Sequence, residues 1–169
     1  MSGQVVEDPV RRQRYRFRLL EHDVLEIELW IDPGGEVPPH LHPRQTERFE
    51  VLSGEVTFRL GRRTTVAGPG KVLEVPPGTR HRFLNKGSET AHARVEVTPP
   101  LELRRSLEEA AALARAGRMT RFNLPTSPAA LVELAAFARR YRDTTVVLSP
   151  PPLVQRVFGD PLARLANRG

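Results

Sequence analysis

Residues 34–55 read GGEVPPHLHPRQTERFEVLSGE, and this stretch decides the fold. His40 and His42 are two positions apart, so in an extended chain both imidazoles point to the same face and can approach one metal ion. Glu47 follows a short irregular segment, and we expect it to open the next strand with its carboxylate turned toward the same place. Glu50 has the opposite parity and is therefore the weaker ligand candidate.

A fourth donor is expected from residues 70–85, which read GKVLEVPPGTRHRFLN. His81 follows the turn sequence PPGT and starts a short strand-like segment. Three imidazoles and one carboxylate suit Fe(II), Mn(II), Ni(II), Cu(II) or Zn(II), and ligand type alone does not choose among these ions. Four protein ligands would leave open positions on a six-coordinate ion, where a substrate or dioxygen could bind. The alternative interpretation is that these side chains are only the polar lining of a pocket.

The first hundred residues have the pattern of an all-β domain. Short segments that alternate apolar and polar residues, the period of a half-buried strand, are separated by turns rich in Gly and Pro. Many short strands at regular spacing predict a sandwich or barrel. The expected strands cover residues 16–20, 24–31, 48–54, 55–61, 71–76, 82–85 and 91–98.

Both stretches resemble the two motifs of the cupin superfamily, and of its small single-domain bacterial-type members in particular. Residues 34–54 fit the pattern G(X)5HXH(X)3-4E(X)6G, and residues 70–85 fit G(X)5PXG(X)2H(X)3N. The resemblance implies a mainly β fold, a single cupin barrel (double-stranded β-helix or jelly roll). It also implies that a divalent transition metal is held at the barrel mouth by His40, His42, Glu47 and His81.

The last third of the chain changes to helical periodicity. Residues 102–118 place apolar side chains on one stripe, with Gly117 as the expected C-cap. Ser127 and Pro128 predict the start of a second helix, in which Leu131, Leu134, Ala138 and Tyr141 would line up. Residues 150–168 predict two further short helical pieces broken at Gly159. We therefore divide the chain into a cupin barrel with an N-terminal strand at 1–100 and a helical extension at 101–169, packed on the barrel or on a partner subunit.

The composition of the chain limits the cofactors and binding partners that it can have. The chain has no cysteine, so disulfides, iron–sulfur clusters and thiol nucleophiles are excluded. The net charge of +6 comes mostly from arginines after residue 100, spaced as on a solvated helix face, which makes nucleic-acid binding an unfavoured interpretation. Neither a leader-like start nor an apolar run of membrane-spanning length is evident, and a cytoplasmic protein without membrane contact is expected. A homodimer is expected too, because strands 16–20 and 91–98 would offer exposed edges that need covering.

Function is left between two hypotheses. One is a metal-dependent enzyme of dioxygenase, isomerase or lyase type that acts on a small metabolite, an oxidoreductase or an isomerase among the options. The other is a non-catalytic barrel that binds or senses a small molecule. The catalytic residues are unknown, because none of the candidate bases, Glu50, Tyr15 and Tyr141, stands out. His22 and His92 are expected to be surface or hydrogen-bonded residues and not ligands. The aromatic residues Phe49, Phe58, Phe83 and Trp30 could line a substrate cavity, but the core is the favoured position for them.

Overall fold

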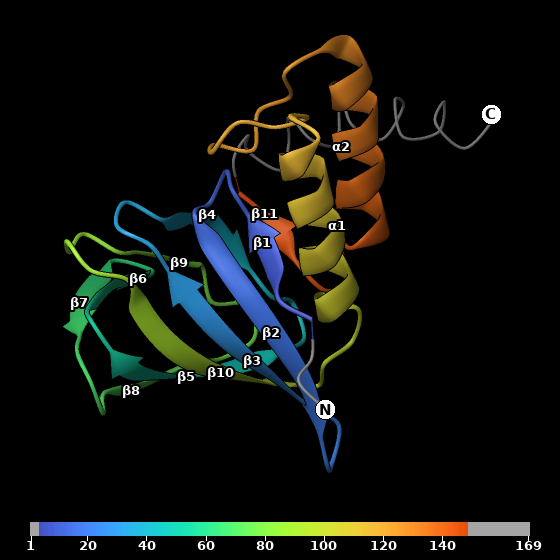
Figure 1. Ribbon diagram of the computed structural model, residues 1–169. Helices are drawn as coiled ribbons and strands as arrows, with labels where there is room; N and C mark the ends of the chain where they lie inside the picture. Colours follow the sequence, from blue (N-terminus) through green and yellow to red (C-terminus); the bar gives the residue numbers. More distant parts are fainter. Residues whose placement is uncertain (1–3, 149–169) are drawn as a thin grey trace.

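The computed structural model describes residues 4–148, which form two antiparallel sheets and two helices (Figure 1). The first sheet has the strand order β1-β2-β3-β10-β5-β8, and the second has the order β11-β4-β9-β6-β7. The strands are β1 (Val6–Asp8), β2 (Gln13–Leu20), β3 (Val24–Ile31), β4 (Glu36–Leu41), β5 (Thr46–Ser53), β6 (Val56–Leu60), β7 (Arg63–Ala67), β8 (Val72–Val75), β9 (His81–Leu84), β10 (Ala91–Thr98) and β11 (Val146–Val147).

The core lies between the sheets and follows from the alternation along each strand. On β5 the side chains of Glu47, Phe49 and Val51 are buried, while the residues between them are half-buried on the outer face. The rings of Phe49, Phe58 and Phe83 form one cluster, with centroid separations of 5.1, 5.5 and 5.8 Å. Fully burying each ring contributes about 1.5–3 kcal/mol. The expected core position of these three residues is confirmed.

Trp30 is an exception to that expectation. It is only half-buried, and its indole stacks on His92 with ring centroids 4.8 Å apart. The two residues are paired across β3 and β10, with the guanidinium of Arg16 above the indole. Trp30 and His92 thus belong to the outer face of the first sheet.

The sheet edges differ from the prediction. The segments at 16–20 and 91–98 are not edges: β2 lies between β1 and β3, and β10 lies between β3 and β5. The edges of the first sheet are β1 and β8, and those of the second are β11 and β7. Strands β1, β4, β7 and β11 were not predicted from the sequence. The argument for a homodimer from uncovered edges at β2 and β10 is therefore wrong, and the homodimer itself stays a prediction.

The two helices stand side by side next to β1 and β11 (Figure 1). Helix α1 (Leu103–Arg115) buries the predicted stripe against β1, and the chain leaves it through Gly117 at φ +66°. Helix α2 (Pro128–Arg140) starts where predicted, because the Ser127 hydroxyl accepts a hydrogen bond from the Ala130 amide at 3.1 Å.

The predicted apolar stripe of α2 is only partly correct. Tyr141 is buried, but Leu131 is 39% exposed, and Ala130 is the helix residue that is fully covered. The helical pieces predicted at 150–168 lie outside the described residues, and the division of the chain at residue 100 stays a prediction. Neither of the described helices is long and apolar enough to cross a bilayer.

Candidate metal centre

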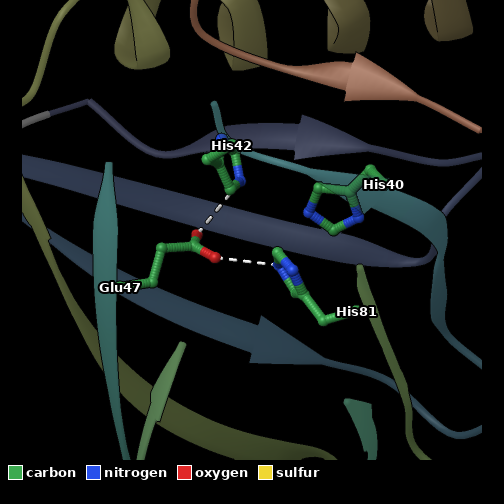
Figure 2. Close-up of side chains that lie close together, drawn as sticks. All are labelled: His40, His42, Glu47 and His81. Carbon is green, nitrogen blue, oxygen red and sulfur yellow. Dashed lines mark ion pairs between the residues drawn. The ribbon is translucent and has the colours of Figure 1, made fainter. Parts of the chain in front are cut away.

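The two sequence stretches meet at one end of the space between the sheets. His40 is on β4, and it faces His81, the first residue of β9, across the ladder. His42 lies just beyond the end of β4, and Glu47 is the second residue of β5. Figure 2 shows the four side chains turned toward a common centre. One ligand atom from each lies within 4.8 Å of the others, and all four residues are buried.

The backbone fixes the orientation of the three imidazoles. Each Nδ1 lies at hydrogen-bonding distance from a carbonyl oxygen: Pro38 for His40 (2.9 Å), Thr144 for His42 (2.7 Å) and Thr79 for His81 (2.9 Å). A carbonyl can only accept, so in the neutral form of each ring Nδ1 carries the proton and Nε2 keeps its lone pair. This is the arrangement by which proteins orient histidines that bind a metal.

Glu47 completes the cluster. Its Oε1 lies 3.4 Å from Nε2 of His42, and its Oε2 lies 2.9 Å from Nε2 of His81 (Figure 2). Despite the short distance, Oε2 of Glu47 and Nε2 of His81 lack a well-aligned hydrogen-bond partner among the described residues, although both are buried. Buried polar atoms are rarely left so, and a cation between them would satisfy both. The donor set and its unpaired atoms therefore fit a divalent metal.

The pKa values of the clustered side chains are shifted in different directions. Burial, and next the neighbouring imidazoles of His81 and His42, lower the pKa of His40 well below its usual range, so this ring is neutral. Burial opposes the charged form of Glu47, but the adjacent His42 and His81 outweigh it and lower the pKa of the carboxyl. Burial likewise opposes protonation of His81, but the contact with Glu47 raises its pKa. Neutral imidazoles and an ionised carboxylate are the forms that bind metals.

A cavity of about 160 Å³ adjoins the cluster and is lined by His40, His42 and Glu47. Most of its wall is apolar, with contributions from β2, β3, β4, β5, β9, β10, both helices and β11. It also contains a polar group made by Asp8, Arg11, Gln13 and Tyr15. The helices and β11 therefore take part in enclosing the space next to the candidate metal centre.

The other candidates from the sequence lie elsewhere. Glu50 is on the outer face of the first sheet, where its carboxylate lies 3.6 Å from the guanidinium of Arg48 and 3.6 Å from that of Arg94. This position agrees with the prediction that Glu50 is a weaker ligand candidate than Glu47. Tyr141 donates to Glu109 on α1 at 2.8 Å and does not line the cavity. Tyr15 does line it. His22 is exposed, as expected.

Two residues near the site were missed by the sequence analysis. Gln13 is a polar residue at an inward position of β2, where Tyr15 and Phe17 follow it at alternate positions, and this parity could have identified it. Thr144, whose carbonyl holds His42, carries no comparable signal, because the contact joins residues 102 positions apart.

Residues 28–98 match the family model described as "Cupin domain". Germin-like protein 5-1 of Oryza sativa subsp. japonica is 40% identical over an alignment of 68 positions, which covers 36% of this chain and 30% of that protein. The chain thus spans less than a third of the length of the curated relatives it matches first.

Two solved structures show the same fold. A conserved protein with a double-stranded β-helix domain from Klebsiella pneumoniae superposes with a TM-score of 0.50 and 25% identity, over 56% of this chain and 83% of that one. An RmlC-like cupin from Shewanella frigidimarina gives a TM-score of 0.54 and 20% identity, over 60% of this chain and 88% of that one. The predicted mainly β, cupin-type architecture is thereby confirmed.

Proposed function

Since the chain belongs to the cupin superfamily, with the family match at residues 28–98, we propose that it is a metal-dependent enzyme for a small metabolite. In this proposal His40, His42, Glu47 and His81 bind one divalent transition metal. The metabolite occupies the cavity that adjoins these four side chains. The reaction is of dioxygenase, isomerase or lyase type.

The observation that carries this proposal is the common orientation of the imidazoles. In His40, His42 and His81, Nδ1 is held by a backbone carbonyl, which leaves three Nε2 atoms and one carboxylate turned toward the same centre. Such a set would cost free energy in a buried pocket without a cation, since each group would lose hydration without a partner. Fe(II), Mn(II), Ni(II), Cu(II) and Zn(II) all accept these ligands.

A metal held here would supply Lewis-acid or redox chemistry to a bound substrate. The residues of the chain then have three tasks. The carbonyls behind the histidines keep the ligands in place, the apolar wall excludes water from the cavity, and the polar group around Gln13 orients the substrate. None of these tasks needs a further acid or base from the protein.

One observation favours a second candidate, a cupin that binds or senses a small molecule without turnover. The titratable groups that line the cavity outside the cluster are engaged in other contacts. Asp8 is paired with Arg11 at 2.7 Å, and the Tyr15 hydroxyl donates to Gln13 at 2.7 Å. Burial, and next the Asp8 carboxylate, raise the pKa of Tyr15, so this phenol is a poor general base near neutral pH.

The first experiment measures the metal content of purified protein by mass spectrometry. We expect about one transition-metal ion per chain, and loss of that ion in His40→Ala and in His81→Ala. His92→Ala is the matched control, because His92 is a histidine on the outer face of the first sheet. Full metal content in both ligand variants would contradict the site assignment.

A second experiment separates the two candidate functions. Metal-loaded protein is incubated with a panel of small organic acids, ketones and sugars, while oxygen uptake and product formation are followed. Substrate-dependent turnover that disappears in His81→Ala supports the enzyme. Saturable binding of one compound without any product would instead establish the binding protein and refute the enzyme.

A further inference from the structure

Gln13 has an unusual position for an uncharged polar residue. It is the first residue of β2, pairs with Ile31 on β3, and is only 2% exposed while lining the cavity. The Tyr15 hydroxyl donates to its Oε1 at 2.7 Å. Its other amide atom, Nε2, is buried and has no hydrogen-bond partner among residues 4–148. A buried donor without an acceptor is destabilising, so its retention here calls for an explanation.

The polar neighbours of Gln13 are already satisfied by one another. The Asp8 carboxylate accepts from the Arg11 amide at 2.9 Å and from the Arg11 guanidinium at 2.7 Å. The same guanidinium donates to Asn123 at 2.6 Å. Among the described side chains that line the cavity, the buried polar atoms without a hydrogen-bond partner are Nε2 of Gln13 and Oε2 of Glu47. One belongs to the candidate metal centre, and the other belongs to no site yet described.

We propose that Gln13 is a specificity-determining residue: its side-chain amide donates a hydrogen bond to the carbonyl oxygen of a small keto acid whose carboxylate binds the metal. This inference rests on the proposed function, because it takes the metal at His40, His42, Glu47 and His81 as given. It adds the chemical class of the ligand and the residue that recognises it.

Charge and polarity of the cavity define this class. Three neutral imidazoles and one carboxylate leave a divalent ion with a net positive charge, which favours an anionic group on its open positions. At Gln13 the nearby charges of Arg11 and Asp8 compensate each other, so the amide is matched to an uncharged acceptor. The rest of the cavity wall is mostly apolar and includes Ile27, Leu29 and Val95. A carboxylate, a short apolar body and a carbonyl meet these three requirements together.

The orientation of the amide follows from Tyr15. The pKa of its buried phenol is raised, which keeps the hydroxyl protonated and able to donate. The hydroxyl donates to Oε1 of Gln13, and the amide NH₂ is thereby the group left for a ligand. A ligand with a hydrogen-bond donor at this position, such as an alcohol that cannot turn its lone pair to the amide, would gain less.

Matched ligand pairs test the proposal. The dissociation constants of 4-oxopentanoate against pentanoate, 5-oxohexanoate against hexanoate, and 4-acetylbenzoate against 4-ethylbenzoate are measured by calorimetry on the Zn(II)-loaded protein. The three pairs vary the separation between carboxylate and carbonyl. We expect at least one keto acid to bind about tenfold more tightly than its partner without the carbonyl, the effect of one well-formed hydrogen bond to an otherwise unpaired buried donor.

Two substitutions then assign the preference to Gln13. Gln13→Leu and Gln13→Met each remove the amide donor, and with it the Oε1 acceptor of the Tyr15 hydroxyl, without adding a charge to the cavity. We expect both to abolish the preference for the keto acid and to leave the affinity of the partner acid within about threefold of wild type. If Gln13→Leu does not fold, Gln13→Met decides alone.

The outcomes separate this inference from the proposed function. A wild-type protein that takes up no metal contradicts the proposed function. A metal-loaded protein that prefers no keto acid, or that keeps its preference in both Gln13 variants, overturns the role of Gln13 and leaves the metal centre standing.

Discussion

The segment at residues 144–148 is predicted to strengthen metal binding, although it lies outside both cupin motifs. The carbonyl of Thr144 accepts from Nδ1 of His42 at 2.7 Å, and the Thr145 hydroxyl lies 3.3 Å from the same nitrogen. Val146 and Val147 pair with Leu41 and His40 on β4, so β11 lies directly beside the ligand strand. Removing these residues leaves His42 without the acceptor that fixes its ring.

The perturbation is a chain that ends at Asp143, compared with a chain that ends at Leu148. The longer chain keeps every described contact of His42 and serves as the matched control. Loss of the group that orients a metal-binding histidine weakens binding about 10- to 100-fold. This corresponds to about 1.4–2.7 kcal/mol of binding free energy. We therefore expect the chain ending at Leu148 to bind like the full chain, and the chain ending at Asp143 to fall by that factor.

The assay is competition between the protein and a chromophoric chelator for Zn(II), with the d–d spectrum of the Co(II) form as a second readout. A distorted Co(II) spectrum in the shorter chain would indicate that His42 has lost its orientation. Thermal unfolding of both chains establishes that the barrel is folded. Equal affinity and equal spectra in the two folded chains would refute the reasoning, because the barrel alone would then orient His42.

Three further predictions concern the cluster and the barrel. Glu47→Gln should remove most of the bound metal in an elemental assay, whereas Glu50→Gln, on the outer face of the same strand, should leave it unchanged. Below the pKa of His81, metal affinity should rise about tenfold per pH unit, because the metal must displace the proton from this imidazole. Burial lowers the pKa of His81, but contact with Glu47 outweighs burial and raises it. A competition titration that gives the same affinity between about pH 6 and pH 8 would contradict this prediction. Gly54→Ala should destabilise the protein by about 2–4 kcal/mol in denaturant unfolding, since Gly54 has φ +70° and an added Cβ would lie 2.8 Å from the backbone of the neighbouring strand. Gly61→Ala, at φ +56° with open space around it, should cost only about 1–2 kcal/mol, and equal losses in the two variants would rule out the close approach as the cause.

The four candidate ligands could be predicted because their signals are local. The separation of two residues between His40 and His42, and the position of Glu47 near the start of β5, follow from strand parity and from the turns around them. Such short-range relations survive folding, since they depend on chain geometry more than on distant partners.

Strand β4 was missed because its sequence, EVPPHL, contains two prolines. Proline lacks an amide hydrogen and is normally excluded from an internal ladder. The structure accommodates both prolines where the pairing of β4 with β9 shifts register, between Val37 and His40. Here the backbone departs from regular pairing next to a ligand, a location where such irregularities are common. The sequence EVPPHL therefore contains no signal that distinguishes this strand from a loop.

Strand β11 illustrates a different limit. It has only two residues, and the partner strand β4 lies more than a hundred positions earlier in the chain. Strands this short have no detectable periodicity, and their pairing depends on how the helices return the chain to the barrel. The same holds for the cavity, whose wall combines β2, both helices and β11. Enclosure of the site is a tertiary property and has no local signature.

The position of the family match within the chain bears on how specificity can vary. The match covers residues 28–98 and includes all four candidate ligands. Gln13 and Tyr15 precede it, and the helices and β11 follow it, yet these segments supply much of the cavity wall and the acceptor for His42. A relative that shares only the matched region can therefore keep the ligand cluster while its flanking segments present a different wall and a different polar group. Since binding selectivity depends on the groups that face the ligand, the relatives' ligands need not be those of this protein. Exchange of residues 4–20 between two such proteins should accordingly change ligand preference without changing metal content.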